Sequence, residues 1–344
     1  MSDETVRLGI VGAGRNTRER HIPGFQAIPG VELVSVANRS RESGERAAKE
    51  FGIAKVYDNW LELVQADDTN AILIGTWPYM HCPITLAALE ANKHVLTEAR
   101  MAMNTQEAQT MLAASRRKPH LITQVVPSPF TFKADRVVRD LLADGYLGNV
   151  LSVELRSTTP AFVDQTSPMH WRQDREMSGY NVLNMGIWYE ALMRWLGPAT
   201  KVMAMTKVCV SQRRDADGIP RAVSIPDHVD VLCEMACGAQ AHLAISAVTG
   251  LAPKTEVWLF GSEGTLHYTP ESLDGGRRGD KQLQAIAVPP DKQGVWRVEE
   301  EFVNAIRGKE KVVLTSFEDG VRYMEFTEAV TRSAQTGQAV SLPL

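Results

Sequence analysis

An apolar strand runs into closely spaced glycines in Arg7-Leu8-Gly9-Ile10-Val11-Gly12-Ala13-Gly14-Arg15-Asn16-Thr17. We predict that Gly12 permits a tight turn and that Gly14 lets backbone amides approach a pyrophosphate, with the next helix N-terminus adding positive partial charge. Thr17 takes the place of the third glycine of this motif, and we expect its hydroxyl to face a phosphate oxygen. The alternative is an ordinary strand-to-helix turn that binds nothing. The candidate cofactor-binding residues of this stretch are Gly12, Gly14, Arg15, Asn16 and Thr17.

Length and composition narrow the class of protein. The 344 residues suffice for two domains, each with its own core. With 37 Lys and Arg against 41 Asp and Glu, the net charge is -4 without a basic or acidic run. This balance argues against nucleic acid and anionic membranes as partners and favours a small molecule.

The chain start and the cysteines predict the compartment. The short acidic start Met1-Ser2-Asp3-Glu4 leaves no room for a signal peptide, and no apolar run has membrane-spanning length, so we expect a cytoplasmic protein. Cys82, Cys209, Cys233 and Cys237 lack the spacing of a zinc site. We therefore expect buried, reduced thiols and no metal.

The first part of the chain alternates strands and helices, which predicts a parallel α/β domain over residues 1–126. The segment 71–74 is apolar throughout, as expected of a strand buried on both faces. Pro23 fits a first helical turn, so we expect a longer loop after Gly14 than in a minimal fold. Pro127-Ser128-Pro129 marks the change of domain. Strands are expected at 31–37, near 56, and at 71–75, 94–97 and 121–126, with helices at 42–51, 60–65, 83–91 and 105–117.

The second part, residues 127–344, has period-two strands that predict an open, mainly antiparallel sheet with one face covered. Long polar loops suggest lids or oligomer contacts. The last two helices are expected to pack back on the body. The strands are expected at 150–157, 201–210, 228–236, 239–248 and 255–261, the loops at 158–178, 211–227 and 270–294, and the helices at 133–144, 296–307 and 317–336.

The end of the second strand predicts which cofactor binds. Dinucleotide-binding folds bind the adenosine ribose here, and NAD usually requires a carboxylate. Asn38 is neutral, whereas Arg39, Ser40 and Arg41 offer donors and positive charge suited to a 2′-phosphate, which favours NADP over NAD. The alternative is that both arginines are solvated surface residues.

The order and spacing of several further motifs resemble the Gfo/Idh/MocA oxidoreductases over nearly the whole chain. The resemblance implies a Rossmann domain followed by an α/β domain with an open sheet. It further implies that Glu98 lies near the nicotinamide ribose and that Trp171 and Arg172 lie against the cofactor. Thr76, Trp77 and His81 belong to the nucleotide edge, where a structural hydrogen bond is the favoured role for His81. The matching stretches are Gly12-Ala13-Gly14, 93–98, Trp171-Arg172, 179–195, 257–265 and 341–344.

The sequence departs from this family at a catalytic motif. Relatives carry Glu-Lys-Pro after the fifth strand, and their lysine helps to move the substrate proton; here the trio is Glu98-Ala99-Arg100. Ala99 has no ammonium group. Without the proline, a cis bond before Arg100 would cost about 2.5–4 kcal/mol, so we predict a trans bond. Arg100 either enters the site as a carboxylate or phosphate clamp or points into solvent.

A second family motif, Asp-x-Gly-x-His-x-x-Asp, has lost its ionisable members. Trp188 stands at the position of the proton-accepting histidine, and Asn184 and Ala191 replace the aspartates. Because an indole only donates, Trp188 cannot take a hydroxyl proton. Tyr189 and Glu190 are one and two residues away on a helix, so they face other directions. Of the two, Tyr189 is the better candidate to reach the site rim, but the favoured alternative is that both are packing or surface groups.

His170, directly before Trp171-Arg172 in a polar loop, is the histidine that we predict as acid or base, the alternative being a surface residue. The candidate catalytic residues are thus His170, Tyr189 and Arg100. One function hypothesis is an NAD(P)-dependent oxidoreductase that acts on a sugar-like or polyol substrate. The other is a nicotinamide-binding protein without net turnover, either a sensor or a lyase or glycosidase that uses the cofactor transiently. Relatives also imply a homodimer or homotetramer through the second sheet.

Overall fold

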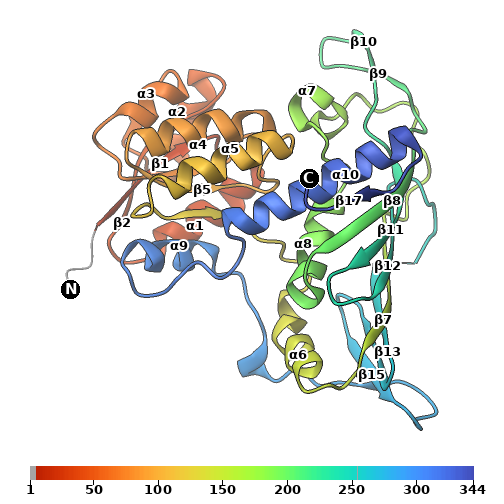
Figure 1. Cartoon of the computed structure of the whole chain (residues 1–344). Coiled ribbons are helices and arrows are strands. Elements are labelled where there is room, and N and C mark those ends of the chain that lie inside the picture. Colours follow the sequence, from red (N-terminus) through yellow and green to blue (C-terminus); the bar gives the residue numbers. More distant parts are fainter. Residues whose placement is uncertain (1–4, 254) are drawn as a thin grey trace. The chain divides into compact units, whose positions relative to one another are not determined.

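The computed structural model describes residues 5–253 and 255–344, so the acidic start Met1-Ser2-Asp3-Glu4 lies outside the described residues. The chain forms two compact units (Figure 1). The first comprises the chain up to Pro127 together with Arg297–Val321, and the second comprises Ser128–Trp296 together with Arg322–Leu344. The segment Arg297–Val321 thus returns to the unit of the first strands, where Phe302 packs edge-on against Phe25 with ring centroids 6.3 Å apart.

The first unit contains a six-stranded sheet of order β3-β2-β1-β4-β5-β6 in which all pairs are parallel. This order is that of a Rossmann fold, as predicted. Its strands are β1 Val6–Val11, β2 Val31–Ala37, β3 Lys55–Val56, β4 Ala71–Ile74, β5 His94–Thr97 and β6 Thr123–Val125. Its helices are η1 Thr17–His21, α1 Ile22–Gln26, α2 Arg41–Phe51, α3 Trp60–Gln65, η2 Pro78–Met80, α4 His81–Glu90, α5 Thr105–Arg116 and α9 Val298–Ile306.

Burial and capping explain these elements. Leu8 and Ile10 of β1 and Ile72 of β4 are fully buried, because helices cover both faces of the parallel sheet. Helix α2 begins where the Ser40 hydroxyl accepts the Ser43 N–H and ends at Gly52, whose φ is +70°. Local sequence signals therefore set the bounds of a helix that tertiary burial stabilises.

The expected long loop after Gly14 is wrong. Arg18 N–H already donates to the Gly14 carbonyl at 3.0 Å, and the π-helical segment η1 leads directly into α1. Pro23 lies in the first turn of α1, as predicted, where a proline without an N–H is tolerated. The π-helical turn lets the helix continue past Pro23, so no loop is needed.

The second unit contains a nine-stranded sheet of order β16-β15-β14-β13-β7-β12-β11-β8-β17. Only the β12–β7 pair is parallel, which confirms the mainly antiparallel sheet. The strands are β7 Val150–Thr158, β8 Ala199–Lys207, β11 His228–Met235, β12 Gln240–Ser246, β13 Glu256–Gly261, β14 Gly264–Tyr268, β15 Leu273–Arg277, β16 Gln284–Ala285 and β17 Val340–Ser341. The helices are α6 Phe132–Ala143, η3 Trp171–Gln173, α7 Arg175–Ser178, α8 Met185–Leu196, η4 Pro290–Lys292 and α10 Phe317–Thr336, which crosses the boundary after Val321.

One face of this sheet is covered and the other is open, as expected. Val229 and Val231 of β11 are fully buried, whereas Leu232 is 59% exposed. Helix α10 lies along the covered face, where Ser333 accepts the Ala204 N–H of β8 at 3.0 Å. Alternate residues of each strand therefore form a core face and an accessible face.

The expected loops contain more structure than we predicted. The segment 211–227 holds a hairpin of β9 Gln212–Arg214 and β10 Pro220–Ala222, and 270–294 holds β15, β16 and η4. Adjacent glycines hide the alternation of β15 from a sequence pattern. Among the cysteines Cys82 and Cys233 are buried, but Cys237 is exposed, which corrects the expectation for that thiol. Within the described residues, no helix has both the length and the apolar composition to cross a membrane.

Candidate cofactor and substrate sites

The glycine loop after β1 has the geometry of a phosphate cradle. Gly12 has a φ of +87°, and a Cβ at this position would lie 2.9 Å from the backbone of Gly75 and from Thr76. A Cβ on Gly14 would lie 3.4 Å from the Gly75 carbonyl oxygen, an ordinary contact distance. The ends of β1 and β4 therefore approach so closely that only glycine fits at Gly12. The residues present fit a dinucleotide pyrophosphate at this edge.

Thr17 holds this loop through a side-chain hydrogen bond. Its side chain is 1% exposed, and its hydroxyl donates to the Gly12 carbonyl at 3.2 Å. This corrects the expectation that the hydroxyl faces a phosphate, because the buried Oγ1 is already engaged. Arg15 is 88% exposed and lies 3.9 Å from Glu19, so it is free to move toward a ligand.

The end of β2 brings the predicted adenosine-side residues together. Asn38 Oδ1 accepts the Ala13 N–H at 2.8 Å, and Ser40 caps α2. The Arg39 guanidinium lies 5.9 Å from the centroid of the Trp77 ring. Arg41 instead pairs with Glu45 and Asp58, so it is a solvated surface residue, as the alternative interpretation stated. Of the two arginines, Arg39 is thus the one without an ion pair to a neighbouring carboxylate among the described residues.

Glu98, at the carboxyl end of β5, belongs to a buried polar cluster. Its Oε1 accepts from Asn16 Nδ2 at 2.5 Å and lies 3.1 Å from His21 Nε2. His21 is fully buried, and its Nδ1 lies 2.5 Å from Glu299 Oε1. Burial lowers the pKa of His21, but the hydrogen bonds to Glu299 and Glu98 outweigh it and raise the pKa to about 9. Burial likewise opposes ionisation of Glu98, yet His21 and Asn16 hold its pKa below the usual value.

His81 and Arg100 lie next to each other. His81 is fully buried, with Nδ1 2.8 Å from the Arg100 carbonyl and Nε2 3.0 Å from the Thr76 carbonyl, so its role is structural, as favoured. Burial lowers its pKa. The bond between Ala99 and Arg100 is cis, so the predicted trans bond is wrong. The prediction considered only the intrinsic preference of a non-proline peptide bond for the trans form. In the fold, the Arg100 carbonyl is in contact with the buried His81 ring. Arg100 is 4% exposed, which excludes its solvent alternative.

In the second unit, Trp188 lies near the start of α8. It is 3% exposed and packs against Phe130, with ring centroids 4.7 Å apart. Its indole Nε1 is buried without a hydrogen-bond partner among the described residues. Asn184 donates to the Ser157 hydroxyl at 3.0 Å. These positions therefore offer one unpaired donor and no base.

Tyr189 belongs to the core, which agrees with the favoured packing role and not with its place among the catalytic candidates. It is 1% exposed, stacks on Phe326 at 3.7 Å, and its hydroxyl accepts the Ala199 N–H at 2.7 Å. Burial raises its pKa. One step of an α-helix turns the side chain by about 100°, away from the face of Trp188. Glu190 is also buried and accepts the Ser128 N–H at 2.6 Å.

His170, Trp171 and Arg172 form a local group at η3. His170 Nδ1 accepts the Arg172 N–H at 3.2 Å, and Gln173 completes a capping box. The Arg172 guanidinium lies 4.2 Å from the Trp171 ring centroid. Burial and then the charge of Arg172 lower the pKa of His170, and Nε2 has no hydrogen-bond partner within the described part of the chain. While Nδ1 accepts this hydrogen bond, the neutral imidazole carries its proton on Nε2, so the ring can accept a proton only when Nδ1 is released.

Sequence reasoning missed His21 and Glu299. The spacing of four residues from Thr17 to His21 places both on one side of a helical turn, but it does not distinguish a buried ion pair from packing. Glu299 reaches the cluster from α9, and no local pattern could have linked it to His21.

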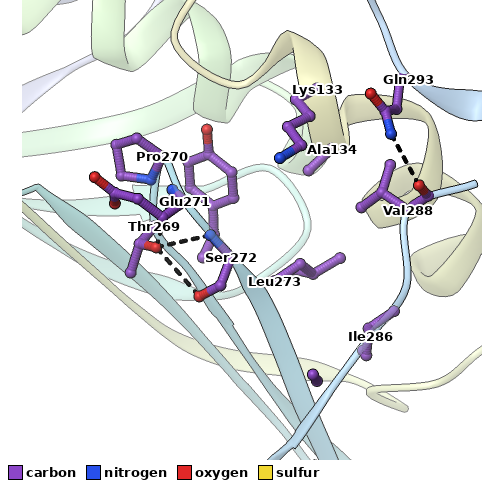
Figure 2. A pocket seen from close by; sticks show the side chains of 12 residues that line it. Lys133, Ala134, Thr269, Pro270, Glu271, Ser272, Leu273, Ile286, Val288 and Gln293 are labelled. Atoms are coloured by element: carbon purple, nitrogen blue, oxygen red, sulfur yellow. Dashed lines mark hydrogen bonds between the residues drawn. The ribbon is translucent and has the colours of Figure 1, made fainter. Parts of the chain in front are cut away.

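A surface pocket of about 290 Å³ lies between α6 and the β14–β15 hairpin (Figure 2). Thr269 bonds to Ser272, and Gln293 donates to the Val288 carbonyl. None of the predicted site residues line it. Among the described residues, no group of three His, Cys, Asp or Glu side chains has the arrangement of a metal site.

Two sequence models of one family match the chain. The model described as "Oxidoreductase family, NAD-binding Rossmann fold" matches residues 6–125, and the "GFO/IDH/MocA C-terminal domain" matches residues 136–267. The chain is 28% identical over 344 residues to dTDP-3,4-didehydro-2,6-dideoxy-alpha-D-glucose 3-reductase of Streptomyces antibioticus, covering 97% of this chain and 99% of that protein. It is 28% identical over 350 residues to 1,5-anhydro-D-fructose reductase of Ensifer adhaerens, covering 98% of both.

Solved structures share the whole fold. Levoglucosan dehydrogenase in complex with NADH and levoglucosan has a TM-score of 0.85 at 20% identity, covering 98% of this chain and 100% of that chain. The WlbA dehydrogenase from Bordetella pertussis, in complex with NADH and UDP-GlcNAcA, has a TM-score of 0.81 at 20% identity, covering 100% of this chain and 99% of that chain. At these identities the likeness establishes the fold.

Proposed function

Because the chain belongs to the GFO/IDH/MocA family of NAD-binding Rossmann oxidoreductases, we propose that it is a nicotinamide-dependent oxidoreductase acting on a sugar-like or polyol small molecule. The glycine cradle carries this proposal, because the φ of Gly12 and its contact with Gly75 leave backbone amides at the carboxyl edge of the sheet. The names of the two reductases support a sugar-like substrate.

Three groups of residues would hold the cofactor. The glycine loop with Arg15 and Asn16 would bind the pyrophosphate, and Glu98 would bind near the nicotinamide ribose. The family resemblance implies that Trp171 and Arg172 would also contact the cofactor. When bound, the nicotinamide ring would supply or accept hydride. His170 would exchange the substrate proton once the Arg172 N–H leaves Nδ1, because Ala99 and Trp188 cannot do so.

Cofactor preference follows from the end of β2. Arg39 and Ser40 offer positive charge and a hydroxyl where a 2′-phosphate would lie, and Asn38 brings no repelling carboxylate. We therefore infer that NADP binds more tightly than NAD.

The open face of the second sheet supports self-association. Met203 of β8 lies directly opposite Leu232 of β11, and both are exposed, at 49% and 59%. Met205 adds a further apolar side chain that is 78% exposed. We infer that a second copy of the chain covers this patch, in a homodimer or homotetramer. Leu232→Lys should then yield monomers in sedimentation velocity, and an unchanged wild-type mass would contradict this inference.

Two experiments test the function. The protein is titrated with NADP and NAD, and sugars and sugar acids are then screened for a change in reduced-cofactor absorbance. Binding with turnover supports an oxidoreductase. Trp188, a donor at the position of the family's base, favours a second candidate, a nicotinamide-binding protein without net redox turnover, for which binding without steady-state absorbance change is expected. Absence of binding at millimolar concentration would overturn both.

A further inference from the structure

The buried cluster around His21 places two carboxylates against one imidazole. Each ring nitrogen of His21 faces a carboxylate oxygen, Glu299 Oε1 on one side and Glu98 Oε1 on the other. A neutral imidazole has one donor and one acceptor nitrogen, so it would point a lone pair at one of the two carboxylates. Both contacts are favourable only when both nitrogens carry a proton. Asn16 Nδ2 also lies 3.3 Å from Nε2, but Glu98 Oε1 is nearer at 3.1 Å, so the geometry fits an imidazolium between two carboxylates.

The second carboxylate serves to hold the imidazole. Glu299 is 3% exposed, and it enters the cluster from the first turn of α9, far along the chain from His21. A Cβ on Gly24 would lie 2.8 Å from Glu299 Cδ, so the glycine of α1 leaves the space that this carboxylate fills. The site is therefore built jointly by α1 and α9.

Glu98 is the member of the cluster that reaches a ligand. Its side chain is 14% exposed, whereas that of His21 is fully buried. Oε1 is held by Asn16 and His21, and Oε2 has no hydrogen-bond partner among residues 5–253 and 255–344. A carboxylate fixed through one oxygen can accept a hydroxyl through the other without reorganising.

We propose that His21, held by Glu299, is a positioning residue whose positive charge fixes Glu98 so that Glu98 Oε2 accepts a hydroxyl of the bound nicotinamide cofactor. This inference rests on the proposed function and extends it to two residues outside the motifs. The charged groups that face the imidazole are Glu98 and Glu299, and His81, whose nitrogens face the Thr76 and Arg100 carbonyls, acts on Glu98 only through its charge. The raised pKa of His21, about 9, agrees with a ring that stays charged at neutral pH.

Binding measurements on paired variants test the role. Glu299→Gln removes the second carboxylate, and Glu300→Gln makes the same change one residue on, at an exposed side chain. We expect E299Q to weaken binding of the preferred nicotinamide cofactor about tenfold or more, measured by tryptophan fluorescence, because the acceptor of the His21 hydrogen bond loses its negative charge. E300Q should bind as the wild type does. Equal affinities of E299Q and E300Q would overturn the proposal.

The pH profile separates positioning from a purely structural role. In the wild type, the affinity should stay flat between about pH 6 and 8, since His21 remains charged. In E299Q the imidazole loses its proton at lower pH, so the affinity should fall within this window as pH rises. Histidine nitrogen NMR of the free protein should show both His21 nitrogens protonated at pH 7 in the wild type. A neutral ring there would overturn the proposal.

Gly24→Ala displaces the Glu299 carboxylate without removing a charge, and it serves if E299Q does not fold. We expect an affinity between those of wild type and E299Q, and an affinity equal to wild type would count against the proposal. If the wild type binds neither NAD nor NADP, the proposed function fails together with this role. If the wild type binds a cofactor, and E299Q and G24A both bind it as tightly as the wild type does, only the positioning role fails.

Discussion

The Asn38 carboxamide oxygen accepts the Ala13 N–H at 2.8 Å, which ties the end of β2 to the glycine loop after β1. One side chain therefore holds the loop that faces the pyrophosphate while standing where the adenosine ribose is expected. This relationship explains how a neutral residue at this position serves the site, because an amide oxygen holds the loop without adding a negative charge.

Asn38→Asp keeps an acceptor for Ala13 but adds a negative charge. We expect the Kd for NADP to rise by about tenfold, since like charges would meet at the 2′-phosphate, while NAD binds at least as well as before. Isothermal titration with both cofactors checks this. The matched Asn38→Ala should weaken both cofactors alike, because it only frees the loop. An unchanged NADP-to-NAD ratio in N38D would refute the assignment.

Gly12→Ala and Gly14→Ala should separate folding from binding. A side chain at Gly12 is strained at φ +87° and contacts Gly75 and Thr76, so we expect a loss of about 2 kcal/mol in the free energy of unfolding. At Gly14 a Cβ meets only an ordinary contact, so stability should stay within about 0.5 kcal/mol while cofactor affinity falls. Urea unfolding and cofactor titration measure the two effects. Full cofactor affinity in G14A would argue against the cradle.

Tyr189→Phe should affect stability alone. The buried Ala199 N–H would lose its acceptor, which costs about 1–2 kcal/mol of unfolding free energy. Tyr180→Phe is the control, because that ring lies under Arg175 and no hydrogen bond of its hydroxyl is lost. Chemical denaturation compares the two variants. A changed pH profile of turnover in Y189F, rather than a changed stability, would restore a catalytic role.

His94 should make the fold sensitive to acid. Burial and then the charge of His120 lower its pKa to about 4, and its Nδ1 accepts the Ile122 N–H at 2.9 Å. Between about pH 6.5, the unfolded value, and about pH 4, the unfolded chain binds a proton that the folded chain does not. Stability is therefore present above pH 6.5 and falls as pH decreases toward 4.

His94→Asn keeps an acceptor and removes the titration. We expect it to abolish about 2 kcal/mol of the acid-induced loss, measured by denaturation at pH 7 and pH 4.5. If the free energy of unfolding falls equally in the variant and the wild type, other titrating groups cause the acid-induced loss.

His170→Gln should lower turnover of any substrate that the screen identifies by about 100-fold and remove the corresponding limb of its pH profile, while cofactor affinity stays within about twofold. Glutamine preserves a polar side chain at the N-cap of η3, so the loop should keep its fold. Unchanged turnover in H170Q would mean that another group moves the proton.

The sequence by itself determined the fold class and the cofactor-binding loop. Both depend on local rules: apolar runs set the strands, side-chain caps set the helix starts, and glycines at Gly12 and Gly14 allow backbone conformations that other residues avoid. The bounds of β2, β5 and α10 agree with the sequence pattern because these rules act within a few residues. Strand β15 was missed since its glycines carry no alternation.

Only the tertiary structure decided which side chains of the site are available. It buried Tyr189 against Phe326, turned the Thr17 hydroxyl to a carbonyl, and brought Glu299 to His21 across 278 residues. The physical reason is that hydrogen bonding, burial and charge pairing depend on distances in space. Two residues far apart along the chain carry no mark of the contact that they make once β1, α1 and α9 have packed together.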